Sequence, residues 1–473
     1  MTSAFGRIGQ RPLIEWMRPL IRHQVARLGH HNLWRCPPAW APGPGPVVED
    51  GWTRLASPAL PPEWGRGRWY EMGLDGRGLG VVVDKEAGAA TFTACLAVSG
   101  PDLVLSSAED RRAALSAWGD VLASAARARG GLARLQVVER AVPDLIDEPA
   151  AWLERAGGGA GEVARAAYEE VLAGLRTRAT AHHVLVCLQV APAKGGLSEG
   201  MGELAAEVAA LVRRLAGTGF SALPLSGSDL AGCCRAIVSP PGPELSRLPV
   251  APSGAGPMAR RTSWGEVATD GVHHACYWVA QWPRVDLRPD WLAPLVLAPT
   301  GAIRTLSVVM EPLAPHVALR AAEAEVSAQA LDADARSRWG FASRARYARQ
   351  YEAAIEREAE LVAGHAGFRF AGLVGVTAPD PDALHRTCRE LEAAGARSQI
   401  ELRRLYGQQD EALAALAPLG RVRLAGRWAA IQLRCSLQFP GRAARTAPSW
   451  PRLTLTTKVG GVAQEARGIN PPP

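Results

Sequence analysis

The sequence predicts an α+β protein with two ferredoxin-like or α/β-sandwich domains, joined by a Pro/Gly-rich linker and preceded by an amphipathic helix. Each half of the chain opens with two short β-type runs and then alternates amphipathic helices with strands, which favours helices packed on sheets. A Pro/Gly-rich stretch at 239–260 separates the halves. The 473 residues, 48% of them hydrophobic, are enough for two or three domains of about 150 residues each.

The first segment, residues 1–36, contains a basic amphipathic helix. Pro12 suits the first turn, and Pro19 should kink the helix. Apolar residues gather near one face of it, namely Leu13, Ile14, Met17, Leu20, Ile21, Val25 and Leu28. Such a helix either lies on an anionic membrane or packs on the chain's own domain. The residues predicted to contact the membrane surface are Arg18, Arg22 and Arg27.

A Pro/Gly spacer at 37–47 precedes the first α+β domain, predicted at 48–238. Strands at 79–84 and 90–98 flank a turn and form a hairpin. Ser107 caps the following helix, which ends at Gly130. The periodicity then predicts strands at 132–138, 183–190 and 220–225, with helices around 164–175 and 201–215.

The linker is predicted at 239–260 and the second α+β domain at 261–425. A hairpin opens this domain, with strands at 261–268 and 273–279 around an Asp-Gly turn. Asp380 is the expected N-cap of a helix that begins at Pro381. The other predicted elements are strands at 303–310, 368–376 and 400–405, a long helical region at 316–364, and a helix at 408–416. The C-terminal extension, 426–473, is predicted to be largely disordered.

Residue spacing excludes several kinds of active site. None of the three lysines is followed by Ser or Thr, so the chain has no Walker A nucleotide site. None of the 8 cysteines forms a C-x-x-C pair and no H-E-x-x-H occurs, so the cysteines are expected to be buried small hydrophobes. No run reaches the roughly 18 apolar residues that cross a bilayer. No catalytic, cofactor-binding or metal-ligating residue is predicted.

Two stretches of the chain resemble a known family. The first is 79–88 (LGVVVDKEAG), followed by a strand at 90–98 and by LQVVER at 135–140; the second is 400–409 (IELRRLYGQQ). Together they resemble an uncharacterised actinobacterial integral-membrane protein family, found with conjugation-like (type IV) secretion ATPases and PrgI-type membrane proteins. The first stretch is also similar to the EccE component of type VII secretion. The second is similar to the non-catalytic N-terminal half of conjugal-transfer ATPases. The resemblance covers about residues 8–420.

The resemblance implies a non-catalytic structural or interaction subunit of a membrane-associated secretion or transfer apparatus, at the cytoplasmic face of the cell membrane. Its implied partners are other subunits of that apparatus, including a transfer ATPase, and no cofactor is implied. Relatives begin with two transmembrane helices, and residues 9–16 match the region just after them. Either such helices are encoded upstream of a start codon placed too late, or this member is peripheral.

Two alternatives remain open at this point: an enzyme with an unrecognised site, and a nucleic-acid-binding accessory protein of a transfer system. A pocket that gathers His, Asp and Cys side chains would favour the enzyme. Steep salt-dependent retention on DNA would favour the accessory protein, although the net charge of +7 does not require such a partner. A small-molecule ligand is not expected.

Overall fold

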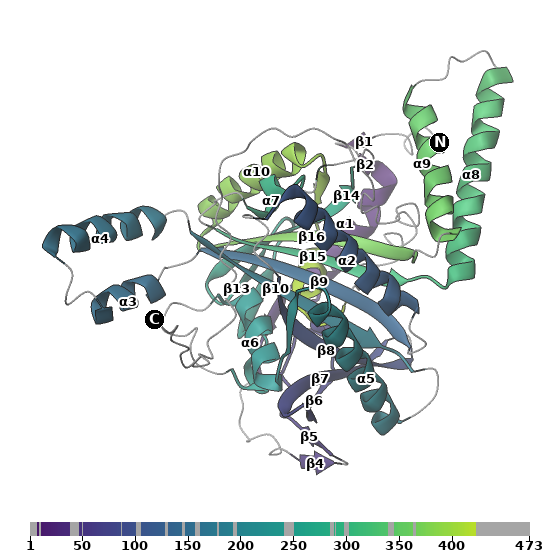
Figure 1. Ribbon diagram of the computed structural model, residues 1–473. Helices are drawn as coiled ribbons and strands as arrows, with labels where there is room; N and C mark the ends of the chain where they lie inside the picture. The colour runs from purple at the N-terminus through teal and green to yellow at the C-terminus, as the bar shows by residue number, and fades with distance from the viewer. Residues whose placement is uncertain are drawn as a thin grey trace, which may run out of the picture.

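The computed structural model (Figure 1) shows a mixed α+β fold built on one large antiparallel sheet. It describes residues 7–8, 11–37, 47–49, 51–86, 88–100, 106–127, 131–143, 147–156, 161–176, 179–192, 196–240, 250–283, 288, 290–297, 302–338, 345–362 and 366–421. The predicted C-terminal extension, 426–473, and most of the predicted spacer at 37–47 lie outside these residues.

The N-terminal part of the described chain carries short strands and one long helix. Its elements are β1 (Arg7–Ile8), β2 (Arg11–Pro12), α1 (Leu13–Leu28), β3 (Leu33–Arg35), β4 (Val47–Glu49), β5 (Trp52–Arg54) and the 3₁₀ turn η2 (Pro62–Trp64). The rest of the first half comprises β6 (Arg68–Leu74), β7 (Arg77–Glu86), β8 (Ala89–Ser99), α2 (Ala108–Arg127), β9 (Leu132–Pro143), α3 (Asp147–Ala156), α4 (Glu162–Arg176), β10 (Thr180–Val190), α5 (Leu197–Ala216), β11 (Ser221–Pro224) and α6 (Gly227–Val238).

The second half repeats the alternation of strands and helices. It comprises η5 (Pro252–Gly254), β12 (Ala259–Thr262), β13 (Val267–Thr269), β14 (Val272–Gln281), α7 (Ala293–Val296), β15 (Ile303–Pro312), α8 (Pro315–Arg338), α9 (Ala345–Val362), β16 (Phe368–Ala378), α10 (Pro381–Arg397), β17 (Glu401–Arg404) and α11 (Gln409–Leu416). The predicted helical region at 316–364 is thus two helices that pack against each other, α8 and α9.

One sheet runs through both halves of the chain, and its paired strands are antiparallel. In the first half the strands pair in the order β11-β8-β10-β9, and in the second half in the order β17-β14-β16-β15. The two halves meet where β9 pairs with β15, with Val138 opposite Ser307. Because this pairing is made of ladder hydrogen bonds, the halves share a continuous backbone network.

Helices cover both faces of the sheet, which explains the near-continuous apolar runs in the central strands. Successive residues of β10, such as Val186 and Cys187, belong to different core clusters because side chains alternate along a strand. The helices α2, α5 and α10 pack on one face, where Trp282 contacts the clusters of both halves. The helices α6 and α11 pack together with η2 on the other face.

Local signals placed several element boundaries correctly. The backbone NH of Asp110 donates to Ser107 Oγ at 3.1 Å at the start of α2, and that of Ala383 donates to Asp380 Oδ1 at 2.7 Å at the start of α10. Other elements were not predicted, among them β3 to β6, α3, α6 and α7. Within the predicted linker, Ala255 is buried in the core that α6 and α11 share.

Candidate interaction surface at helix α1

Helix α1 is fixed to the second half of the chain by an aromatic cluster. The Trp16 ring lies 6.2 Å from the ring of Trp264 and 5.8 Å from that of Tyr406, between centroids. The ring of His23 meets Trp264 edge-on at 5.2 Å. Burial, with the nearby Arg27 charge, lowers the pKa of His23, so this imidazole packs as a neutral ring at neutral pH.

A charged cluster beside the aromatic rings also holds α1 in place. Arg22 Nη2 lies 3.3 Å from Asp410 Oδ2, and Arg22 Nη1 lies 2.8 Å from Glu411 Oε2. Both carboxylates belong to the first turn of α11, where the helix dipole favours negative charge. Burial raises the pKa of Glu411 to about 7, although the Arg22 guanidinium acts in the opposite direction.

A second arginine joins this cluster from the sheet. Arg260 Nη1 pairs with Glu63 Oε2 at 2.6 Å, and Arg260 Nη2 donates to the His31 carbonyl at 3.0 Å. Only 2% of the Arg260 side chain is exposed. Burial raises the pKa of Glu63. Three carboxylates therefore gather around two guanidinium groups, which leaves a surplus of negative charge when all of them are ionised.

The charged cluster forms one side of a groove along α1, of about 640 Å³. Its lining residues are Met17, Ile21, Arg22, Val25, Ala26, His31, Glu63 and Asp410. One wall is apolar and supplied by α1, while the other carries carboxylates from η2 and α11. The groove thus suits an occupant that is both apolar and cationic.

The apolar residues of α1 are exposed along most of the helix, and we call them the α1 stripe. Met17 is 58% exposed and Leu28 is 82% exposed, and the other members are Leu20, Ile21 and Val25. They recur at helical spacing, so they form one band rather than scattered positions. A contiguous exposed apolar band on a folded body is typical of an interaction site.

Two of the three arginines predicted to contact a membrane, Arg22 and Arg27, have different environments in the structure. Arg22 turns into the fold and pairs with Asp410 and Glu411, whereas the Arg27 side chain is exposed. The side chain of Arg18 lies outside the described part of the structure. Helix α1 therefore packs on the chain's own domain, which is one of the two alternatives drawn from the sequence, and it still exposes its apolar stripe. Membrane contact stays a prediction.

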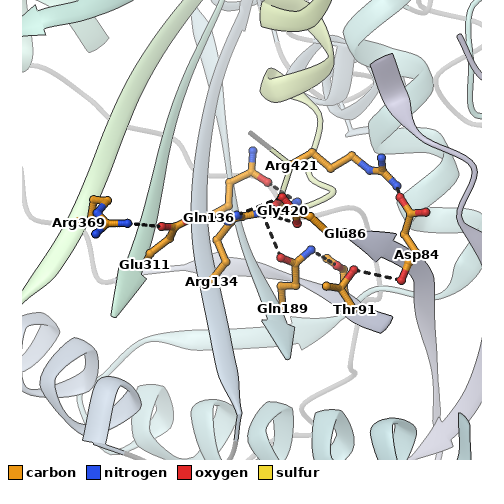
Figure 2. Close-up of polar contacts among 11 residues, drawn as sticks. Asp84, Glu86, Thr91, Arg134, Gln136, Gln189, Glu311, Arg369, Gly420 and Arg421 are labelled. Atoms are coloured by element: carbon orange, nitrogen blue, oxygen red, sulfur yellow. Dashed lines mark hydrogen bonds and ion pairs between the residues drawn. The ribbon is translucent and has the colours of Figure 1, made fainter. Parts of the chain in front are cut away.

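A second polar cluster ties the halves together in the centre of the sheet (Figure 2). Arg134 of β9 bonds to Glu86 at 3.0 Å, to Glu311 at 2.7 Å and to the Gly420 carbonyl at 2.8 Å. The fully buried Gln136 accepts a bond from the Gly420 NH and donates to the carbonyls of Ala415 and Ala417. The side chains of Arg134 and Gln136 have several partners each within the fold, so the cluster acts as a structural junction.

Smaller polar contacts occur elsewhere in the described residues, among them a buried chain in which His274 bonds to Thr269 at 2.6 Å and to Thr377 at 2.8 Å. His182 Nδ1 lies 2.7 Å from Glu139 Oε1, and the thiols of Cys95 and Cys187 lie 3.3 Å apart. Burial raises the pKa of Cys95 well above that of a free thiol, so it stays protonated at neutral pH. No group of three or more His, Cys, Asp or Glu in the described ranges could hold a metal ion.

The helices were compared with the requirements of a membrane span, and the sequence was compared with known proteins. Within the described residues, no helix is both long and apolar enough to cross a bilayer. No protein-family model matches the sequence, and no curated protein matches it. Among the described residues, the α1 stripe and its groove combine exposed apolar side chains with a groove of about 640 Å³, as is typical of an interaction site.

Proposed function

We propose that this chain is a non-catalytic interaction subunit of a membrane-associated secretion or conjugation-like transfer apparatus, positioned at the cytoplasmic face of the membrane. The observation that carries the proposal is the α1 stripe, an exposed apolar band on a helix that the body holds in place. Further support comes from the resemblance at 79–98 and 400–409 to proteins of such systems.

The membrane is the proposed contact of the α1 stripe because the exposed apolar residues lie on a helix that also exposes Arg27, on a chain of net positive charge. Arg27 is exposed on α1, and Arg35 of β3 and Arg261 of the paired strand β12 are exposed as well. Each basic residue near an anionic surface adds about 1 kcal/mol of attraction. Apolar area removed from water adds about 25 cal/mol per Å². The stripe and these arginines together supply both signals that stable peripheral binding needs.

We also propose that the two halves of the chain are related ferredoxin-like domains. Each half is a ferredoxin-like unit, since both follow the strand order 4-1-3-2 with β8 and β14 as their first strands. Two helices of each unit, α2 with α5 and α7 with α10, belong to the apolar clusters on one face of the sheet. The resembling stretch at 400–409 covers β17 and the start of α11, within the second unit.

Partner subunits are proposed to bind the two helical hairpins, α3–α4 and α8–α9. Each hairpin connects the same two positions of its half, β9 to β10 in the first and β15 to β16 in the second. They extend from opposite sides of the sheet in Figure 1. Large apolar side chains are exposed on both, including Trp152, Val163 and Val171 on the first and Leu331, Ile355 and Val362 on the second. Exposed apolar helical faces of this kind are typical of protein–protein contacts.

Fractionation of the native cells tests this proposal. The full chain is expected in the membrane fraction, and purification from mild detergent is expected to bring a transfer ATPase with it. Recovery of the chain entirely in the soluble fraction, without such an ATPase, would contradict the proposal.

A further inference from the structure

The groove beside α1 is continuous with the α1 stripe, the surface proposed to contact the membrane. Ile21 and Val25 belong both to the stripe and to the lining of the groove. A molecule anchored in the membrane can therefore reach the groove along apolar surface. The groove's volume of about 640 Å³ lies within the range of about 300–1,000 Å³ that sites for small ligands occupy.

The polar side of the groove carries charges of both signs. Glu63 and Asp410 line it as carboxylates, and Arg22 lines it as a guanidinium group. The two carboxylate side chains are only 14% and 11% exposed, so solvent screens them weakly. Arg22 Nη2 lies 3.3 Å from Asp410 Oδ2, so the two signs stand next to each other. The groove therefore presents fixed opposite charges beside an apolar wall.

Carboxylates outnumber cations on this polar side. The carboxylates belong to Glu63, Asp410 and Glu411, and the guanidinium groups that pair with them belong to Arg22 and Arg260. When all three carboxylates are ionised, a surplus of negative charge lies beside the surface that approaches an anionic membrane. This surplus opposes the approach, because like charges repel. A cation held in the groove would remove that repulsion.

An aminophospholipid has the groups that match this groove. Its primary ammonium donates hydrogen bonds of the charge-assisted kind to carboxylates, and its phosphate, a few bonds away, accepts from a guanidinium group. Its acyl chains suit an apolar wall. The quaternary ammonium of phosphatidylcholine has no N–H to donate, and phosphatidylglycerol has no cation. A basic peptide supplies the cation but not the neighbouring anion, so the charges of both signs favour the lipid.

We propose that the groove binds one aminophospholipid of the phosphatidylethanolamine class, with its ammonium at Glu63 and Asp410, its phosphate at Arg22 and an acyl chain along the α1 stripe. The chain then recognises one lipid headgroup in addition to the anionic surface around it. This inference rests on the proposed function for the membrane that supplies the lipid.

Binding of water-soluble lipids to the purified full chain tests the inference without a membrane surface. Dihexanoyl-phosphatidylethanolamine and dihexanoyl-phosphatidylcholine are titrated below their micelle concentrations, and calorimetry gives the Kd of each. The ethanolamine lipid is expected to bind about tenfold more tightly, because only its ammonium donates hydrogen bonds to the carboxylates. Equal affinities for the two lipids, or no binding of either, would overturn the inference.

Two variants with matched controls locate the binding site. Ala26 lines the groove, so Ala26→Trp fills it and should weaken binding of the ethanolamine lipid about tenfold or more. Ala164→Trp, at an exposed position of α4, is its control and should bind like the native chain. Asp410→Asn removes one carboxylate with little change of shape and should reduce the preference for the ethanolamine lipid, whereas Glu169→Gln on α4 should keep it.

Native-like binding in Ala26→Trp, or a native-like lipid preference in Asp410→Asn, would overturn the inference. Cell fractionation judges the proposed function separately. A chain that fractionates with membranes but does not distinguish the two soluble lipids would keep the proposed function and lose the headgroup site.

Discussion

Arg22 in the N-terminal helix pairs with Asp410, which lies 388 residues further along the chain, at a distance of 3.3 Å between Nη2 and Oδ2. This contact and the pairing of Arg22 with Glu411 hold α1 in its orientation together with the aromatic cluster around Trp16. Because Arg22 turns towards α11, the apolar stripe of the same helix turns towards solvent. The orientation of the exposed surface thus depends on a few polar contacts at its edge.

Substitution of Arg22 by Ala is expected to destabilise the protein by about 1 kcal/mol, because it leaves Asp410 and Glu411 without their cation. The Arg22 side chain is 35% exposed, so solvent limits the loss. Arg27→Ala is the matched control in the same helix, with a change expected within about 0.5 kcal/mol. Urea unfolding of the three proteins measures both values, and equal losses would contradict the role given to Arg22.

Glu411 is expected to make stability depend on pH near neutrality. Its pKa in the folded state is about 7, above the value of 4.5 for a free glutamate. The folded state therefore holds this proton more tightly, and the stabilisation is complete below about pH 4.5 and is lost as pH rises through 7. Glu411→Gln removes the titrating group, so it should be more stable than the native protein at pH 8, by an amount on the order of 1 kcal/mol.

The measurement is the free energy of unfolding from pH 5 to 8 for the native protein and for Glu411→Gln. The native curve should fall more steeply than that of the variant. Glu169→Gln, on the exposed face of α4, serves as the control for loss of a carboxylate. A Glu411→Gln curve parallel to the native one would show that Glu411 does not titrate in this range.

Gln136 is expected to be among the most sensitive positions in the sheet. Its amide is fully buried and bonds to Ser307, to the carbonyls after α11 and to the Gly420 NH. Gln136→Leu leaves the buried Gly420 NH without its acceptor and removes one of the donors to each of the carbonyls of Ala415 and Ala417, so a loss of about 2 kcal/mol is expected. Gln281→Leu, at an exposed end of β14, should cost less than about 0.5 kcal/mol. Similar thermal midpoints for the two variants would contradict the junction role.

Elements with local signals could be predicted from the sequence, whereas contacts between distant segments could not. Ser107 and Asp380 marked helix starts because each cap needs only residues within one turn. Helix α6 also carries such a signal, a capping box between Ser226 and Asp229, although this helix was not among the predicted elements. The pairing of β9 with β15 has no local signature, since the register joins Glu139 to Leu306 across the chain.

The candidate interaction surface at α1 was predicted only in part, because the helix has a local pattern whereas the groove beside it is formed by distant segments. Helical periodicity identified α1 and its apolar face, because that pattern is contained within the helix. From the same pattern, Arg18, Arg22 and Arg27 were all predicted to contact the membrane surface. Only the fold shows that Arg22 meets carboxylates of α11. The groove also depends on Glu63 and Arg260, which lie far from α1 in the sequence and carried no signal of their own.

The central claim is that the α1 stripe binds an anionic membrane, and vesicle flotation tests it most directly. The chain is mixed with vesicles of phosphatidylglycerol and phosphatidylethanolamine, and the test variant carries Ile21→Asp and Val25→Asp, both at exposed positions that should preserve the fold. Val163→Asp on α4 is the control. Each lost apolar contact is worth about 1 kcal/mol, so the test variant should bind more than tenfold more weakly, whereas the control floats like the native chain. Flotation of the test variant equal to that of the native chain, or no flotation of the native chain at all, would contradict the claim.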